Sequence, residues 1–476
     1  MTRDTDSPAG AAATWPANDP ATWRTLPETS TPLDPARIQT LLAAEWERFG
    51  VGTGGSAAHH QRAVVPMPLG VASSFQYWDP HPIAIESAKG AWLRDVDGRD
   101  LLDLSMGFGA VLVGHLNPTV VAAVTRALDS GTLFVTPSPS TTDIAERFTR
   151  RFGIDQVRFA NSGTEATMYA VRAARMFTGR HGIVKIEGGY HGGYDALSVS
   201  VKPDVADAGP EDAPTPVVPF EVEAGIVHVV PYNNLERLEQ VLAAHSDEIA
   251  AIVMEPVLEN LSIVLPDEGY LAAVRAACDR HGVLLVFDEV KTGLTAGYAG
   301  ASRRLGVTPD LIALAKSIGG GLPLAAFGGR QEVMDTITDG RMWHFGTYNG
   351  NPLTMAAAAA VDEVCTEAAL DAAEAINDDA LRAIDELIVR YELPAHTVGF
   401  GVKGAAIWSP TPVRNYRDYK RTDFEAAELS WLWGVNRGIL TPPGLDEQWL
   451  VSLAHTEADM GLLVAAFDEL AQALRA

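Results

Sequence analysis

Residues 311–323 read LIALAKSIGGGLP, an apolar run that ends in a lysine and continues into three consecutive glycines. Five apolar residues before Lys316 are typical of a buried strand, so the amine would be partly desolvated. Burial lowers the pKa of an amine and favours the neutral, nucleophilic form that makes an imine. A lone lysine at a strand end usually extends to solvent, but Gly319, Gly320 and Gly321 let the backbone pass close to a ligand. The stretch therefore predicts a strand that ends in a reactive lysine.

Three earlier apolar runs have the same form, and helical stretches separate them, as a parallel sheet with crossover helices requires. In open α/β sheets, ligands lie outside the carboxyl ends of the strands, so the polar residues at these ends should converge on one site. The sequence therefore predicts an α/β fold with a site at one sheet edge. The runs are IVKIEG (183–188), AAIVMEP (250–256) and VLLVFDE (283–289).

Asp288 stands near the end of the third run. A buried carboxylate needs a cationic partner to remain charged, and a pyridinium nitrogen would serve. Such an ion pair keeps the ring electron-deficient, so that it can absorb carbanion charge. An ordinary helix cap or ion pair would also explain this aspartate.

Residues 159–177, FANSGTEATMYAVRAARMF, predict a turn that opens an amphipathic helix. Ser162, Gly163 and Thr164 would present backbone N–H groups at the helix N-terminus, where the helix dipole also attracts phosphate. An ordinary N-cap explains Ser162 and Thr164 equally well, but the glycine between them favours a phosphate site.

Two further glycine-rich segments carry candidate ligand contacts. GGYHGG (188–193) follows a predicted strand, and the flat ring of Tyr190 could stack on a cofactor ring there. No second ligand has metal-binding spacing around His191, so no metal site is predicted. HFGTYNGNPLTM (344–355) contains another Gly-Thr pair before a helix, and Thr347 could bind phosphate in its own subunit or in a neighbour's.

Composition limits the classes of function. Among 476 residues, acidic residues outnumber basic ones 61 to 36, and the formal net charge is -25. Nucleic acids and anionic membranes demand a basic footprint, so neither is an expected partner. Cys278 and Cys365 form no CxxC pair, which argues against a disulfide framework. No apolar run of about 18 residues or signal peptide is evident, so we expect a cytoplasmic protein.

The pattern along the chain predicts a domain organisation. Residues 1–35 are expected to be a tail without fixed structure. Residues 36–117 form the first part of a small domain, including a hairpin at 91–104 that turns at Asp97-Gly98. Residues 118–345 form a large domain, and residues 346–476 complete the small one.

Together, NSGTEAT, EGGYHGG, MEPV, FDEVKTG, AKSIGGGLP and GTYNGNPLTMAA resemble, in order and spacing, the class III pyridoxal-phosphate-dependent aminotransferases of fold type I. The resemblance runs from about residue 66 to the C-terminus, and it is greatest to the glutamate-1-semialdehyde 2,1-aminomutases and the β-amino-acid aminotransferases. It implies a large pyridoxal-phosphate-binding domain with a mostly parallel sheet and helices on both faces. A smaller α+β domain would come from both chain ends.

The resemblance also implies residue roles. Lys316 would hold pyridoxal 5′-phosphate as a Schiff base and move the proton between the substrate Cα and the cofactor C4′. Asp288 would pair with the pyridine nitrogen, with Tyr190 stacked on one ring face and Val290 on the other. The other implied cofactor contacts are Ser162, Gly163 and Thr164 near the phosphate, His191 beside Tyr190, Asn260 near the 3′-oxygen and Thr347 from a partner subunit.

The sequence departs from the family where relatives bind the substrate carboxylate. Ser73 aligns with the arginine of the β-amino-acid enzymes, Gln76 stands about where the aminomutases have theirs, and Pro443 replaces a further arginine. Losing such a guanidinium removes a contact worth about 1.5 to 3 kcal/mol, so we expect a different substrate. Lys291 and Arg414 are candidate replacement cations, although ordinary ion pairs would explain both. Phe108 and Trp78 are candidate pocket residues.

Three hypotheses of function follow. The leading one is an aminotransferase that moves an amino group between an amine or amino acid and a carbonyl acceptor, in a homodimer with shared active sites. The alternative is an intramolecular aminomutase of the glutamate-1-semialdehyde type, or another isomerase or racemase that uses the same cofactor. A catalytically silent regulator is disfavoured, because no DNA-binding extension is evident and the chain is acidic.

Overall fold

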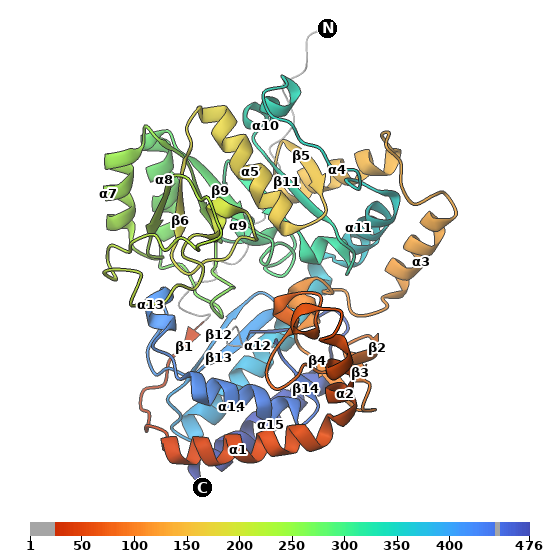
Figure 1. Cartoon of the computed structure of the whole chain (residues 1–476), viewed down its shortest axis with the longest axis vertical. Helices are drawn as coiled ribbons and strands as arrows, with labels where there is room; N and C mark the ends of the chain where they lie inside the picture. The colour runs from red at the N-terminus through yellow and green to blue at the C-terminus, as the bar shows by residue number, and fades with distance from the viewer. Residues whose placement is uncertain (1–23, 443–447) are drawn as a thin grey trace.

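The computed structural model describes residues 24–442 and 448–476, which form two lobes (Figure 1). The large lobe contains a seven-stranded sheet in the order β5-β11-β10-β9-β8-β6-β7. Neighbouring strands from β7 to β10 are parallel, whereas β11 runs antiparallel to β10 and β5. The strands are β5 (Gln156–Ala160), β6 (Gly182–Ile186), β7 (Val227–Val230), β8 (Ile249–Met254), β9 (Leu284–Asp288), β10 (Leu311–Leu314) and β11 (Ala325–Gly329).

Helices cover both faces of this sheet because its buried strands alternate their side chains. Ile252 and Met254 pack in one core with α7 and α8, whereas Ala251 and Val253 pack in another with α5 and α10. This period of two is the one that a strand imposes. The helices of the large lobe are α3 (Pro118–Leu128), α4 (Pro139–Phe152), α5 (Gly163–Thr178), α6 (Asp195–Ser198), α7 (Leu235–His245), α8 (Tyr270–His281), α9 (Gly300–Arg304), α10 (Gln331–Thr338) and α11 (Pro352–Val364).

The small lobe combines segments from both ends of the chain in two four-stranded sheets, β1-β12-β13-β15 and β14-β4-β3-β2. In the first sheet β1 pairs with β12, and in the second β4 pairs with β14. The strands are β1 (Arg24–Thr25), β2 (Ile85–Lys89), β3 (Trp92–Asp95), β4 (Asp100–Asp103), β12 (His396–Phe400), β13 (Lys403–Ile407), β14 (Ile439–Leu440) and β15 (Trp449–Leu450).

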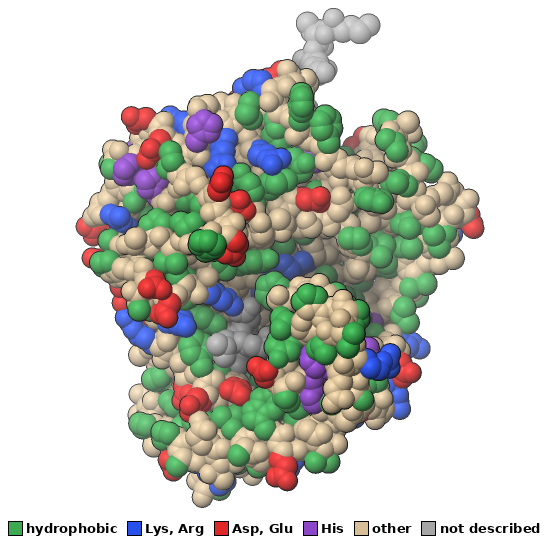
Figure 2. Space-filling model, in the orientation of Figure 1, with side chains coloured by type: hydrophobic (Ala, Val, Ile, Leu, Met, Phe, Trp, Pro, Cys, Tyr) green, Lys and Arg blue, Asp and Glu red, His purple; other side chains and the backbone are tan. Residues whose placement is uncertain are grey.

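Helices pack against these two sheets, with α1 against α14 and α12 against α15. Among the described residues, no helix combines the length and the apolar character needed to cross a membrane. The surface is hollowed between the two lobes (Figure 2). The helices are α1 (Pro35–Gly52), α2 (Gly54–Ala63), α12 (Glu367–Arg390), α13 (Tyr416–Tyr419), α14 (Phe424–Val435) and α15 (Glu457–Arg475).

The predicted strands and the predicted hairpin are present in the structure. The four apolar runs form β6, β8, β9 and β10, and the predicted hairpin is β3 and β4, with Gly98 at a φ of +83° in its turn. Part of the expected tail is structured, because β1 pairs with β12 and the Asp34 side chain caps α1 by accepting a hydrogen bond from Ala36 N at 2.9 Å. Residues 1–23 lie outside the described residues. The domain boundaries at 117/118 and 345/346 stay predictions.

A buried ion pair joins the two lobes. Lys403, at the start of β13, places its Nζ 2.5 Å from Oε2 of Glu259, in the loop after β8. The exposed fractions of the two side chains are 2% and 0%. Lys403 Nζ also donates to the Lys291 carbonyl at 3.1 Å, and Lys291 Nζ donates to the Glu259 carbonyl at 2.5 Å. The charges of Lys403 and Glu259, which come from different lobes, thus compensate each other.

We expect Lys403→Met to lower the free energy of unfolding by about 3 to 5 kcal/mol, because it leaves Glu259 as an uncompensated buried charge. Glu259→Met should lower the free energy of unfolding by a similar amount, because it leaves Lys403 as an uncompensated buried charge. The double variant should recover most of the loss, since two apolar side chains need no partner. Urea unfolding of the four proteins measures this coupling, and a double-variant loss equal to the sum of the single losses would contradict it.

Candidate active site

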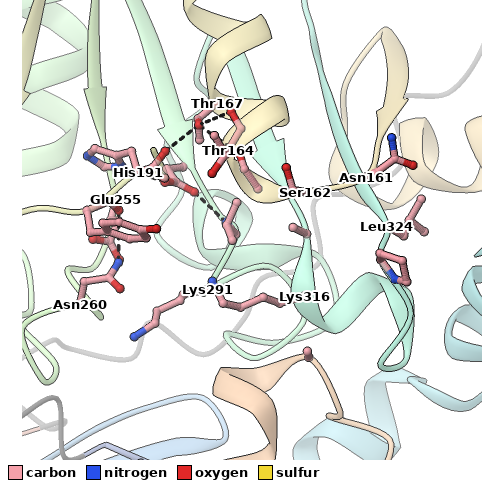
Figure 3. A pocket seen from close by; sticks show the side chains of 18 of the residues that line it. Asn161, Ser162, Thr164, Thr167, His191, Glu255, Asn260, Lys291, Lys316 and Leu324 are labelled. Atoms are coloured by element: carbon pink, nitrogen blue, oxygen red, sulfur yellow. Dashed lines mark hydrogen bonds and ion pairs between the residues drawn. The ribbon is translucent and has the colours of Figure 1, made fainter. Parts of the chain in front are cut away.

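The ends of the parallel strands surround a cavity of about 390 Å³ in the large lobe (Figure 3). It lies where the carboxyl ends of β8, β9 and β10 meet the N-terminus of α5 and the loop after β6, as expected for an open α/β sheet. Of the residues predicted to contact a cofactor, the cavity is lined by Ser162, Gly163, Thr164, Tyr190, His191, Asn260, Asp288, Val290 and Lys316.

Lys316 projects into this cavity from the end of β10. It opens a short 3₁₀ helix, Lys316–Gly319, with a φ of +49°, in the left-handed region that costs a lysine of order 1 to 3 kcal/mol. Burial lowers the pKa of Lys316, the Asp288 carboxylate opposes this shift, and the Lys403 ammonium adds to it. Figure 3 shows the side chain extending toward His191, Glu255 and Asn260. The environment therefore favours a neutral amine that faces the cavity.

Asp288, the last residue of β9, is 4% exposed and shares its carboxylate between two donors. His191 Nδ1 lies 2.8 Å from Asp288 Oδ2, and Val290 N donates to Oδ1 at 2.9 Å. Burial lowers the pKa of His191, and the hydrogen bond to Asp288 opposes this shift. A neutral imidazole with its proton on Nδ1 satisfies this contact. His191 thus positions the Asp288 carboxylate.

The first turn of α5 presents two backbone N–H groups at its N-terminus. Ser162 Oγ accepts from Glu165 N at 3.2 Å, and Glu165 Oε2 accepts from Asn161 N at 2.7 Å, so the Ser162 side chain acts as an ordinary cap. The backbone N–H groups of Gly163 and Thr164 open the helix and receive no acceptor within it. These two N–H groups and the helix dipole favour a bound phosphate.

Glycines let three segments approach one another around this turn. A Cβ on Gly163 would lie 3.0 Å from a methyl group of Val290, so a larger residue would displace the valine. Gly192, with a φ of +89°, leaves no room for a Cβ beside the Thr164 hydroxyl. Gly193 N donates to the same hydroxyl at 3.2 Å, which ties the loop of residues 188–193 to α5.

A buried lysine stabilises the loop of residues 188–193. Lys185, in the middle of β6, is fully buried, and its Nζ donates to the Gly189 carbonyl. Asn260 Nδ2 donates to the Tyr190 carbonyl at 3.3 Å from the other side. Tyr190 itself is half-buried and lines the cavity. Its position is therefore set through the backbone on both sides.

Glu255 lines the cavity without having been predicted as a site residue. Burial, with a further contribution from the Asp288 charge, raises the pKa of Glu255 to about 7, while a hydrogen bond from Asn260 opposes the shift. Its Oε2 accepts from Glu259 N at 3.0 Å, whereas its buried Oε1 has no hydrogen-bond partner among the described residues. The MEPV motif contained this residue, and its place at a strand end was the available signal.

Thr347 is the predicted contact that does not line the cavity of its own chain. It is exposed and lies among exposed aromatic side chains, with Trp343 73%, Phe345 75% and Tyr348 63% exposed. Contiguous exposed apolar groups of this kind are typical of surfaces that bind another protein.

A second cavity, of about 720 Å³, adjoins the first through aromatic side chains. Phe75 lines it, and its ring centroid lies 5.8 Å from that of Phe108 and 5.7 Å from that of Tyr190. Phe108 and Trp78, both predicted pocket residues, line this cavity as well. Its other described lining residues include Met67, Val71, Ile83, Ile85, Leu93 and Leu440.

The candidate cations take different positions. Arg414 is exposed and pairs with Asp267, with 3.2 Å between Nε and Oδ1, so it serves as an ion pair outside both cavities. Lys291 lines the first cavity, with its Nζ 5.8 Å from the ring centroid of Phe108.

Ser73 is exposed, Gln76 lines the second cavity, and Pro443 lies outside the described residues. Among the described lining residues of the two cavities, none is an arginine.

The sequence matches the family model described as Aminotransferase class-III over residues 75–406. The chain belongs to this family. It is 38% identical over 407 residues to the glutamate-1-semialdehyde 2,1-aminomutase of Methanocorpusculum labreanum, covering 84% of this chain and 96% of that protein.

Two solved structures resemble this class-III aminotransferase closely. A glutamate-1-semialdehyde aminomutase from Pseudomonas aeruginosa PAO1, in complex with PMP, has a TM-score of 0.85 and 27% identity over 93% of this chain and 99% of that chain. An omega-transaminase from Sphaerobacter thermophilus has a TM-score of 0.83 and 32% identity over 88% and 98%. The predicted family and fold type I architecture are therefore confirmed.

Class-III aminotransferases depend on pyridoxal 5′-phosphate, which is the cofactor of this chain. The cavity fits that group in charge and in chemistry. Asp288 offers a buried anion for a pyridinium nitrogen, the first turn of α5 offers N–H groups for a phosphate, and Lys316 offers an amine for an aldehyde. Asn260 also lines the cavity and offers an amide to the 3′-oxygen of the cofactor.

The buried Lys185 of this class-III aminotransferase predicts a pH effect on stability. Burial lowers the pKa of Lys185 from 10.5 to about 7, against the opposing charges of Glu255 and Glu187. Between these two values the unfolded chain binds a proton that the folded chain does not, so the contribution of Lys185 to stability rises with pH across this window. We expect Lys185→Met to abolish that rise, and the exposed Lys89→Met variant to keep it. Urea unfolding at pH 7, 8 and 9 measures the difference, and parallel pH profiles of Lys185→Met and the unmodified protein would contradict the assignment.

Proposed function

We propose that this class-III aminotransferase moves the amino group of a small substrate at Lys316. The observation that carries the proposal is that a desolvated amine and a buried carboxylate, Asp288, line one cavity at the carboxyl ends of adjacent parallel strands. The range 118–345, proposed as the large domain, contains every residue named above as lining the first cavity.

Pyridoxal phosphate, when bound, supplies an electron sink for the negative charge that develops at the substrate Cα. Asp288 would hold the positive charge of the ring nitrogen in place, and His191 keeps that carboxylate oriented through its 2.8 Å contact. Gly163 and Thr164 would bind the phosphate through their N–H groups. Tyr190 and Val290 would contact the ring and exclude water from it.

Lys316 would have two tasks, to hold the cofactor and to move a proton. Burial lowers the pKa of Lys316, which shifts the amine toward the neutral form that a general base requires. Its side chain extends toward the other polar groups of the cavity, so the same amine can take a proton from the substrate and return it. The 3₁₀ turn and its three glycines leave space for this side chain next to a ligand.

We propose intramolecular transfer, as in an aminomutase, as the first outcome to test. Curated relatives named glutamate-1-semialdehyde 2,1-aminomutase support it, with 37% to 39% identity over 84% to 90% of this chain in four examples. They support this outcome better than the intermolecular transfer that led among the sequence-based hypotheses.

The second cavity favours intermolecular transamination as a second candidate. Aromatic and aliphatic side chains line it, and Gln76 stands there about where the aminomutases are expected to place an arginine. Because no described lining residue offers a guanidinium for a carboxylate, the lining supports a substrate with an apolar or aromatic group. An amine of this type would need a separate carbonyl acceptor.

The two outcomes differ in whether they need that acceptor. We expect glutamate-1-semialdehyde to be converted without a second substrate if transfer is intramolecular, and an aromatic amine to react stoichiometrically with an added 2-oxo acid if it is intermolecular. Mass spectrometry of both products distinguishes them. Lys316→Ala should lower either turnover by at least about 100-fold, since it removes the proton-transfer group. Undiminished turnover of Lys316→Ala would overturn the proposed function.

We also infer a homodimer with shared sites, in the cytoplasm. The exposed Thr347 and its aromatic neighbours support a subunit interface in which Thr347 completes the partner's phosphate site. The two buried cysteines are free thiols, which suits a reducing compartment.

Mixing Lys316→Ala subunits with Thr347→Ala subunits tests the shared site. When Lys316→Ala and Thr347→Ala subunits are refolded together, about half of the dimers are mixed, and each would contain one intact site of two. We therefore expect about a quarter of the unmodified activity. If Thr347 acted in its own chain, each mixed dimer would have a defect in both sites, and activity would not exceed the average of the two parent variants.

A further inference from the structure

A cluster of two histidines and one glutamate lies at the edge of the large sheet, away from the cofactor cavity. His228 is on β7, the edge strand of the seven-stranded sheet, and His245 is the last residue of α7. Glu248 lies in the connection between α7 and β8. Helix α7 forms an outer side of the large lobe in Figure 1. None of the three lines either of the cavities described above.

The ligand atoms of these side chains converge. Glu248 Oε1 lies 2.9 Å from His245 Nδ1 and 3.1 Å from His228 Nε2. The two imidazole centroids are 4.4 Å apart with an interplanar angle of 31°, and all three ligand atoms lie within 4.8 Å of one another. Ligands at about 2.0 to 2.2 Å from a tetrahedral Zn²⁺ lie about 3.3 to 3.6 Å from one another. Small side-chain rotations therefore suffice to form such a site.

We propose that His228, His245 and Glu248 bind a divalent transition-metal ion, with Zn²⁺ the ion that their chemistry fits best. Two imidazole nitrogens and one carboxylate oxygen are typical zinc ligands, and three protein ligands leave a fourth position for water. Their exposed fractions of 20%, 45% and 40% keep the cluster accessible to ions from solvent.

The backbone around the cluster is held in place. Gly182 N donates to the Glu248 carbonyl at 2.7 Å, and Glu248 N donates to the His245 carbonyl at 3.0 Å. The C-terminus of α7 directs its negative dipole toward the ion, which favours a cation. Arg237, the basic residue of this helix, donates through Nη1 to Gln240 at 3.3 Å. The ion would connect the edge strand β7 to the connection that leads into β8, and so fasten the outermost strand.

The test uses the cofactor-loaded protein after removal of metals by a chelator. Calorimetric titration with Zn²⁺ should show one site per chain, and His245→Gln and Glu248→Gln should each weaken it at least about tenfold. X-ray absorption of the loaded protein should show two imidazole nitrogens among oxygen ligands. Zn²⁺ should also raise the melting temperature of the unmodified protein but not that of His245→Gln.

His281→Gln provides the matched control. His281 Nε2 lies 3.3 Å from Glu239 Oε2, so this variant removes a single His–Glu pair from the same lobe. It should bind Zn²⁺ as the unmodified protein does. The proposal is overturned if no Zn²⁺ binds, or if all four proteins bind it equally. Because the cluster lies outside the cofactor cavity, turnover should be the same in all four proteins, and this separates the result from that of the proposed function.

Discussion

The burial of one carboxylate organises the active site. Asp288 is almost inaccessible to solvent at the end of β9, so its charge has to be balanced by hydrogen bonds and by positive groups. Because β8 and β10 run parallel on either side, Glu255 and Lys316 reach the same edge of the sheet. Burial, with a further contribution from the Asp288 charge, raises the pKa of Glu255, whereas the same charge opposes the lowering of the Lys316 pKa by burial. The Asp288 carboxylate thus acts on both Glu255 and Lys316 from the strand between them.

Much of the fold could be predicted because its central strands are buried on both faces. Such strands appear in the sequence as continuous apolar runs, and four of them were recognised. The strands β5, β7 and β11 were not among the four predicted runs. β1 and β14, with two residues each, carry too little side-chain pattern to predict, since backbone pairing holds them. The structured residues 24–35 were missed for the same reason.

The site could be predicted where a residue follows an apolar run, as Lys316 and Asp288 do. Contacts between segments that are distant in the sequence could not be predicted. The His191–Asp288 hydrogen bond joins residues 97 positions apart, and the Lys403–Glu259 ion pair joins residues 144 apart in different lobes. The composition around Arg414 likewise did not reveal Asp267 as its partner. Spacing indicates which polar groups share a sheet edge, whereas pairing depends on how the loops between them fold.

The left-handed backbone at position 316 has a consequence for the stability of this enzyme. Glycine would adopt that conformation without strain, whereas the lysine at this position keeps the backbone strained. Under the proposed function, this strain is the cost of placing an amine at the end of β10. Protein stability and the proposed catalysis therefore place opposite demands on Lys316.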